Sequence, residues 1–201
     1  GSAYMRITDN GKGMTEEDAR LAVLRHATSK IQNVEDLFDI ASLGFRGEAL
    51  ASIASVSHFI LTTRTVDQEL GTRILIDGGT FTDCIPYGAA PGTTIEVKEL
   101  FFNTPARRKF LKTERTESSK IQDIVGKLAL SNPHIAFKLT IDERVAIITP
   151  GSGSIQDTVA ALYGYKTKND IFPIAYESEH IYIEGVVSKP TLLKSTRIWQ
   201  T

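Results

Sequence analysis

The sequence lacks the features that define several protein classes. Its single cysteine, Cys84, cannot form an internal disulfide or a thiolate metal site, so a reducing compartment fits and a packed thiol is expected. No apolar run reaches the length of a membrane span, and no charged-then-apolar leader opens the chain, so we expect a cytoplasmic protein without membrane contact. The formal net charge is −1, which excludes a general attraction to nucleic acid and leaves only local patches.

Several common catalytic and nucleotide-binding signatures are also missing. The chain has no GxxxxGK[ST] phosphate loop, no GxGxxG after a strand and no GxSxG nucleophile elbow. Its four histidines show no HxxxH or HExxH spacing, so the sequence predicts no metal site. Any chemistry must come from residues that lie far apart in the sequence.

What is present is typical of a globular protein. The chain has 201 residues, a length that allows one or two domains. Its composition, 41% hydrophobic and 23% charged, is that of an ordinary globular protein. Thr15 with Asp18 predicts a helix start, and Gly78-Gly79 predicts a hairpin turn between two strands. The composition of "PGSGS" at 150–154 predicts a linker, with one domain at 1–150 and a second beginning at 154–201. The other expected strands are 58–65, 71–79, 80–86, 92–97 and 180–187, and a hairpin is expected over 134–150. Three further helices are expected: one directly after Gly47, one over 114–130 and one over 155–163.

Two glycine-containing loops are candidates for ligand binding. "DNGKGM" at 9–14 joins a strand to a helix, and Asp, Asn and Gly there are equally compatible with a plain turn. "GFRGEAL" at 44–50 leads into a helix, and a glycine loop before a helix presents backbone N–H groups to an anion.

Five segments of the chain form a distinctive series: "DNGKGM" (9–14), "RHATSK" (25–30), "GFRGEALASIASV" (44–56), "GTTIEV" (92–97) and "LFFNTPARRKFL" (100–111). Together, and in this order, they resemble the MutL family of DNA mismatch repair proteins. The resemblance implies the gyrase, Hsp90, histidine kinase and MutL superfamily. It therefore implies an α/β (α+β) fold, a Bergerat-type ATP-binding sandwich with a mixed sheet backed by helices. A ribosomal-S5-like α/β domain would begin after it.

The resemblance also implies roles for individual residues. Asp9 would accept a hydrogen bond from the adenine amino group, and Gly11 and Gly13 would let the backbone approach the nucleotide. Thr93 would complete the adenine contact, with Thr94 as the alternative. The segment that covers the phosphates would contain Thr28, Ser29, Lys30, Gly44, Phe45, Arg46 and Gly47.

The family's general base and magnesium-binding residues are not found in this sequence. The resemblance places a glutamate base and an asparagine ligand for Mg²⁺ on a helix before the DNG motif, and a phosphate-contacting lysine beyond Thr201. The opening Gly1-Ser2-Ala3 reads as an expression scar, so we expect a chain truncated at both ends. ATP and Mg²⁺ are the implied cofactors, but this chain alone is expected to be a poor ATPase with no catalytic residue of its own.

The implied function is an ATP-binding and slowly hydrolysing switch that couples nucleotide state to dimerisation. Implied partners are a mismatch-recognition protein, a repair nuclease or helicase, a second N-terminal domain on ATP binding, and DNA without sequence preference. Arg107, Arg108 and Lys109 form the candidate DNA patch, although a solvated helix face explains them equally well, and Phe110 is expected in the core. The alternative function is a non-catalytic scaffold or weak DNA-binding fragment.

Overall fold

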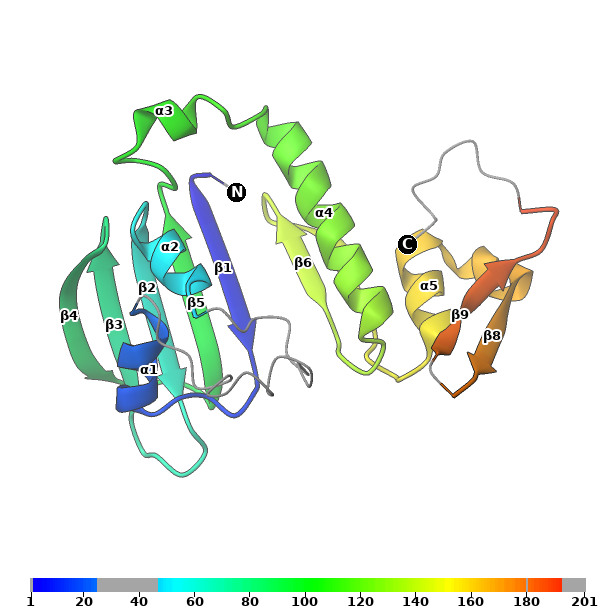
Figure 1. Cartoon of the computed structure of the whole chain (residues 1–201), viewed down its shortest axis with the longest axis horizontal. Coiled ribbons are helices and arrows are strands. Elements are labelled where there is room, and N and C mark those ends of the chain that lie inside the picture. The colour runs from blue at the N-terminus through cyan, green and yellow to red at the C-terminus, as the bar shows by residue number, and fades with distance from the viewer. Residues whose placement is uncertain (1, 25–46, 180, 193–201) are drawn as a thin grey trace. The chain divides into compact units, whose positions relative to one another are not determined.

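The computed structural model describes residues 2–24, 47–179 and 181–192, and they form two compact units (Figure 1). The first unit is Gly1–Lys112 and the second is Thr113–Thr201. The linker predicted at 150–154 lies inside the second unit, between strand β7 (Arg144–Ile148) and helix α5 (Ile155–Tyr163). Where a domain boundary of the protein falls stays a prediction.

The first unit is a five-stranded sheet with short helices. Its strands are β1 (Tyr4–Asp9), β2 (His58–Arg64), β3 (Gly71–Asp77), β4 (Thr80–Tyr87) and β5 (Gly92–Lys98). They lie in the order β1-β5-β2-β3-β4, and every described pair is antiparallel. The expected α/β class is confirmed, but the described strands form an antiparallel sheet rather than the expected mixed one. Helices α1 (Glu16–Ala22) and α2 (Ala49–Ala54) lie against one face of the sheet, and α3 (Pro105–Arg108) follows β5 (Figure 1).

Local sequence signals explain where these elements begin and turn. The Thr15 hydroxyl accepts the Asp18 N–H at 3.1 Å and also donates to the Asp18 carboxylate, which caps α1 as predicted. Gly78 and Gly79 both have positive φ, 55° and 91°, as the tight turn between β3 and β4 requires.

Two apolar rows cross the helix-covered face of the first unit and form most of its core, with Ile7 at the exposed end of the second row. Cross-strand pairing aligns Met5, Val97, Phe59 and Ile76 in one row, and Ile7, Ile95, Leu61 and Ile74 in the next. Ala19 of α1 and Ala54 of α2 pack on these rows, where small side chains let the helices approach closely. Cys84 packs against the same core, and burial raises the pKa of its thiol, so it is the packed thiol that the sequence predicts.

The second unit combines a long helix with two hairpins. Its elements are α4 (Glu114–Ser131), β6 (Lys138–Ile141), β7 (Arg144–Ile148), α5 (Ile155–Tyr163), the 3-10 helix η2 (Tyr165–Asp170), β8 (Ile171–Glu177) and β9 (Tyr182–Ser188). Helix α5 packs on α4 and β7, and its buried residues include Val159 and Ala160. Among the described residues, no helix is long and apolar enough to cross a membrane.

Candidate nucleotide-binding site

A polar row crosses the helix-covered face at the end of β1. Asp9 is the cross-strand partner of Thr93, and Thr93 is in turn the partner of Thr63 on β2. Directly paired residues of antiparallel strands point to the same face, so these three side chains are neighbours. The adjacent row is apolar, with Ile7, Ile95 and Leu61. Polar groups therefore gather at one end of an otherwise apolar face, beside the loop 10–14.

The carboxylate of Asp9 is held by one of its two oxygens. Its Oδ1 accepts the N–H of Gly11 at 2.9 Å and the N–H of Thr93 at 3.3 Å. The first contact closes a local turn, and the second ties the carboxylate to β5. Within the described residues, Oδ2 has no hydrogen-bond partner, and Asp9 is exposed. The side chain is thus oriented by the backbone while one oxygen stays available to a donor.

Two glycines allow backbone segments around the polar row to approach each other closely. Gly13 has a φ of 69°, and a Cβ there would lie 2.0 Å from the Arg64 carbonyl oxygen. Gly92 has a φ of 115°, and its Cβ would lie 2.2 Å from the Asp9 carbonyl oxygen. Neither position admits a side chain without moving backbone. Sequence reasoning singled out Gly13 but missed Gly92, although Gly92 opens the same GTT motif as Thr93.

Thr63 is a second residue of the site that sequence reasoning missed. It is 1% exposed, and its hydroxyl lies within hydrogen-bond distance of Met14 N, Gly92 O and Thr93 Oγ1. This one hydroxyl joins β2, β5 and the loop after Asp9. The available signal was the alternation of "HFILTTR", which places Thr63 on the face of Phe59 and Leu61.

The structure distinguishes the two threonines of GTT by their faces. Thr93 shares the face of Asp9, whereas Thr94 points to the other face and its hydroxyl lies 3.1 Å from that of Thr8. Thr93 is therefore the threonine that lies beside Asp9. Gly11 also lies there, where a Cβ would sit 2.9 Å from Asp9 Oδ1.

Most of the expected phosphate-covering segment lies outside the described residues. This applies to Thr28, Ser29, Lys30, Gly44, Phe45 and Arg46, so their assignment stays a prediction. Gly47 is described, and its φ of 64° lies in the region that favours glycine, two residues before α2 begins.

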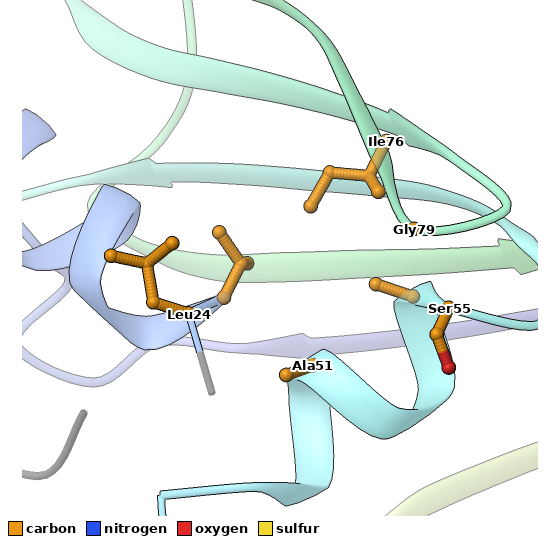
Figure 2. Close-up of a pocket in the computed structure, with 7 residues that line it drawn as sticks. Leu24, Ala51, Ser55, Ile76 and Gly79 are labelled. Carbon is orange, nitrogen blue, oxygen red and sulfur yellow. The ribbon is translucent and has the colours of Figure 1, made fainter. Parts of the chain in front are cut away.

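A separate hollow of about 320 Å³ lies between the ends of α1 and α2 and the β3–β4 turn. Figure 2 shows Leu24, Ala51, Ser55, Ile76 and Gly79 around it. Its lining within the described residues contains neither Asp9 nor Thr93 and has no charged side chain. The hollow therefore offers packing space rather than groups for nucleotide recognition.

The basic residues of the candidate DNA patch lie on and just after α3. Arg107, Arg108 and Lys109 are exposed, and no acidic side chain of the described residues forms an ion pair with them. Phe110 is 82% exposed, so its expected place in the core is wrong. It follows α3, which is only four residues long and has no buried residue, so no longer apolar helix face continues there to bury it.

The described part of the chain presents polar groups in one row but contains no candidate metal centre. No group of three or more His, Cys, Asp or Glu side chains among the described residues could hold a metal ion. The residues that the structure describes thus offer no Mg²⁺ site. The polar row offers a fixed carboxylate oxygen and a threonine hydroxyl, groups that bind donor atoms of a ligand.

Known proteins similar to this chain are mismatch repair proteins. The DNA mismatch repair protein MutL of Desulforamulus reducens is 46% identical over 200 residues, and so is that of Caldanaerobacter subterraneus subsp. tengcongensis. These alignments cover 100% of this chain but 31% and 34% of the relatives, so the chain spans about a third of their length. No protein-family model matches the chain.

Solved structures similar to this chain include ATPase domains of MutL proteins. The Aquifex aeolicus MutL ATPase domain complexed with ADP is 30% identical, with a TM-score of 0.65 over 87% of this chain and 60% of that one. The ATPase domain of the mismatch repair endonuclease MutL from the same organism is 28% identical, with a TM-score of 0.65 over 93% of this chain and 62% of that one.

Proposed function

Because the chain belongs to the MutL family of DNA mismatch repair proteins, we propose that it forms the adenine-binding part of an ATP-driven repair switch. The single observation that carries this proposal is the geometry of Asp9. Its Oδ1 is fixed by two backbone N–H groups, and its Oδ2 has no partner within the described residues. A carboxylate oriented in this way accepts a hydrogen bond from an amino group without first reorganising.

The neighbouring residues support an adenine ring at this place. Thr93 lies beside Asp9 on the same face, and Gly11 leaves the space next to the carboxylate free of a side chain. Gly13 lets the same loop pass close to the backbone of Arg64. The apolar row of Ile7 and Ile95, of which Ile7 is 58% exposed, offers a surface for a flat ring. We propose that Thr28, Ser29, Lys30, Gly44, Phe45, Arg46 and Gly47 contribute to the phosphate side of the site.

Hydrolysis needs groups that the described residues do not supply. General-base activation of water requires a carboxylate within hydrogen-bond reach of the attacking water. In our proposal Asp9 reads the base of the nucleotide instead, and the glutamate base and the Mg²⁺ ligand lie outside this chain. We propose that the protein to which this chain belongs hydrolyses ATP slowly in the cytoplasm. Its nucleotide state would control dimerisation of the N-terminal domain and binding of a mismatch-recognition protein and of a repair nuclease or helicase.

The exposed basic residues favour a second, non-catalytic role for the same unit. Arg107, Arg108 and Lys109 lie together without acidic partners among the described residues, and unpaired cations attract phosphate regardless of base sequence. We propose that this patch contacts DNA. If the chain bound DNA but no nucleotide, the scaffold function would replace the switch.

A nucleotide-dependent shift in unfolding temperature tests the proposal. A ligand that binds only the folded state stabilises it by about 2.7 kcal/mol when its concentration is a hundred times Kd. ADP and ATP should raise the unfolding temperature in a concentration-dependent manner, whereas ribose 5-phosphate, which lacks the base, should not. No shift with ADP or ATP, for the chain or for its full-length protein, would reject nucleotide binding.

A further inference from the structure

The buried hydroxyl of Thr63 determines how the polar row can hydrogen-bond. It lies 2.9 Å from Met14 N, 3.1 Å from Gly92 O and 3.0 Å from Thr93 Oγ1. A hydroxyl has one hydrogen to donate and two lone pairs that accept. The Met14 N–H can only donate, and the Gly92 carbonyl can only accept. The one assignment that satisfies all three contacts has Thr63 donating to Gly92 and accepting from both Met14 and Thr93.

This assignment uses the hydroxyl hydrogen of Thr93. Because that hydrogen points inward to Thr63, only lone pairs of Thr93 are directed toward a ligand. The neighbouring Asp9 carboxylate is also an acceptor, and its Oδ2 has no partner among the described residues. The outer side of the row, formed by Asp9 and Thr93, therefore presents acceptors only.

We propose that Thr63 is a positioning residue that sets base specificity by keeping Thr93 an acceptor. An acceptor-only surface complements the amino group of a 6-aminopurine and repels the carbonyl oxygen of a 6-oxopurine. Thr63 itself does not touch the nucleotide, because it is 1% exposed beneath Thr93. This inference rests on the proposed adenine site and adds the residue that makes the site discriminate.

The variant Thr63→Val tests this role because valine has nearly the shape of threonine without its hydroxyl. It frees the Thr93 hydrogen to turn toward the ligand, where it can donate to a 6-oxo group. It also leaves the buried Met14 N–H without its acceptor, a structural effect that weakens all nucleotides alike. The ratio of affinities for two bases separates the two effects, and Thr63→Ser, which keeps the hydroxyl, is the matched control.

The experiment measures binding of ATP and of inosine triphosphate to the full-length protein by isothermal titration calorimetry. The unsubstituted protein should prefer ATP. In Thr63→Val this preference should fall about three- to tenfold, the effect of one hydrogen bond gained or lost. Thr63→Ser, which keeps the hydroxyl, should have the same preference for ATP as the unsubstituted protein.

The outcomes separate this inference from the proposed function. The role of Thr63 is overturned if Thr63→Val keeps the full ATP preference, or if the unsubstituted protein binds ATP and inosine triphosphate equally. Either result leaves the proposed ATP binding intact. A protein that binds neither nucleotide rejects the proposed function and this inference with it. If Thr63→Val does not fold, Thr93→Val replaces it: it should weaken ATP but not inosine triphosphate, and an equal effect on both overturns the inference.

Discussion

At the scale of single residues, the site depends on backbone that holds side chains in place. The Asp9 carboxylate accepts N–H groups from its own turn and from β5, and Gly92 allows β5 to begin directly against β1. A short polar side chain on a strand end would otherwise rotate freely in water. Fixing it before the ligand arrives lowers the entropic cost of binding.

Replacing Asp9 with alanine should weaken nucleotide binding with little effect on folding. The side chain is exposed, so its loss leaves no cavity. Loss of a hydrogen bond to a charged group should cost about 1.5 to 3 kcal/mol, which corresponds to a loss of affinity from about tenfold to somewhat over a hundredfold. Isothermal titration of ATP into the full-length protein measures this. Thr8→Ala, on the opposite face of the same strand, is the control that should keep its affinity; equal affinities for Asp9→Ala and this control would make Asp9 a turn residue only.

Replacing Gly92 with alanine should destabilise the first unit and the site together. The φ of 115° is strained for alanine, and the added Cβ would lie 2.2 Å from the Asp9 carbonyl oxygen. We expect a loss of about 1 to 3 kcal/mol in the free energy of unfolding, measured by urea denaturation. Gly88→Ala is the matched control, because its Cβ would have nothing within 4 Å. Equal stability of the two variants would contradict the packing described here.

At the scale of elements, the helices α1, α4 and α5 begin after a residue whose side chain accepts one of their free N–H groups. Helix α5 begins after Ser154, whose hydroxyl accepts the Asp157 N–H at 3.2 Å. The Asp157 carboxylate in turn accepts from Lys168 at 2.6 Å and from Ser152 at 3.0 Å. These contacts, the one from Lys168 foremost, hold the pKa of Asp157 below its usual value, and the same pair raises the pKa of Lys168.

The stability contributed by Asp157 should therefore depend on pH in one direction. A carboxyl whose pKa is lowered by folding stabilises the folded state above its unfolded pKa, about 3.9 for Asp, and loses this contribution as the pH falls through its folded value. Asp157→Asn should be less stable than the unsubstituted protein at neutral pH, and the difference should vanish in acid. Urea denaturation at a series of pH values measures it. In a Lys168→Met background most of the difference should disappear; a difference independent of pH and of Lys168 would refute the assignment.

At the scale of the whole molecule, charge is balanced overall and concentrated locally. The formal net charge of −1 cannot attract DNA, so binding depends on patches such as Arg107, Arg108 and Lys109. Each phosphate contact releases counterions, and this makes the affinity depend on salt.

Replacing Arg107, Arg108 and Lys109 together with glutamine should weaken DNA binding and flatten its salt dependence. Each lost phosphate contact reduces the slope of log K against log salt by about 0.9, so three contacts reduce it by roughly 2.7. Fluorescence anisotropy with a duplex of arbitrary sequence at several salt concentrations measures the slope. Lys127→Gln is the control, because Lys127 already pairs with Asp123 at 3.1 Å and should contribute little. An unchanged slope in the triple variant would assign these residues to solubility.

The local sequence by itself determined most of the elements and their turns. Alternation predicts β2 to β5, Gly78-Gly79 predicts the β3–β4 turn, and the predicted helix 155–163 coincides with α5. These signals are local, since each depends on periodicity or on turn residues a few positions apart. The pattern missed η2 and β8, which are short or lack regular alternation.

Only the tertiary structure decided which residues meet at the site. Thr93 lies 84 positions from Asp9 and 30 from Thr63, and strand register alone brings the three into one row. A shift of register by one residue would place Thr94, rather than Thr93, beside Asp9. Local periodicity carries no information about register between distant strands. The DNG turn was therefore readable from the sequence, whereas the buried Thr63 hydroxyl beneath it was not.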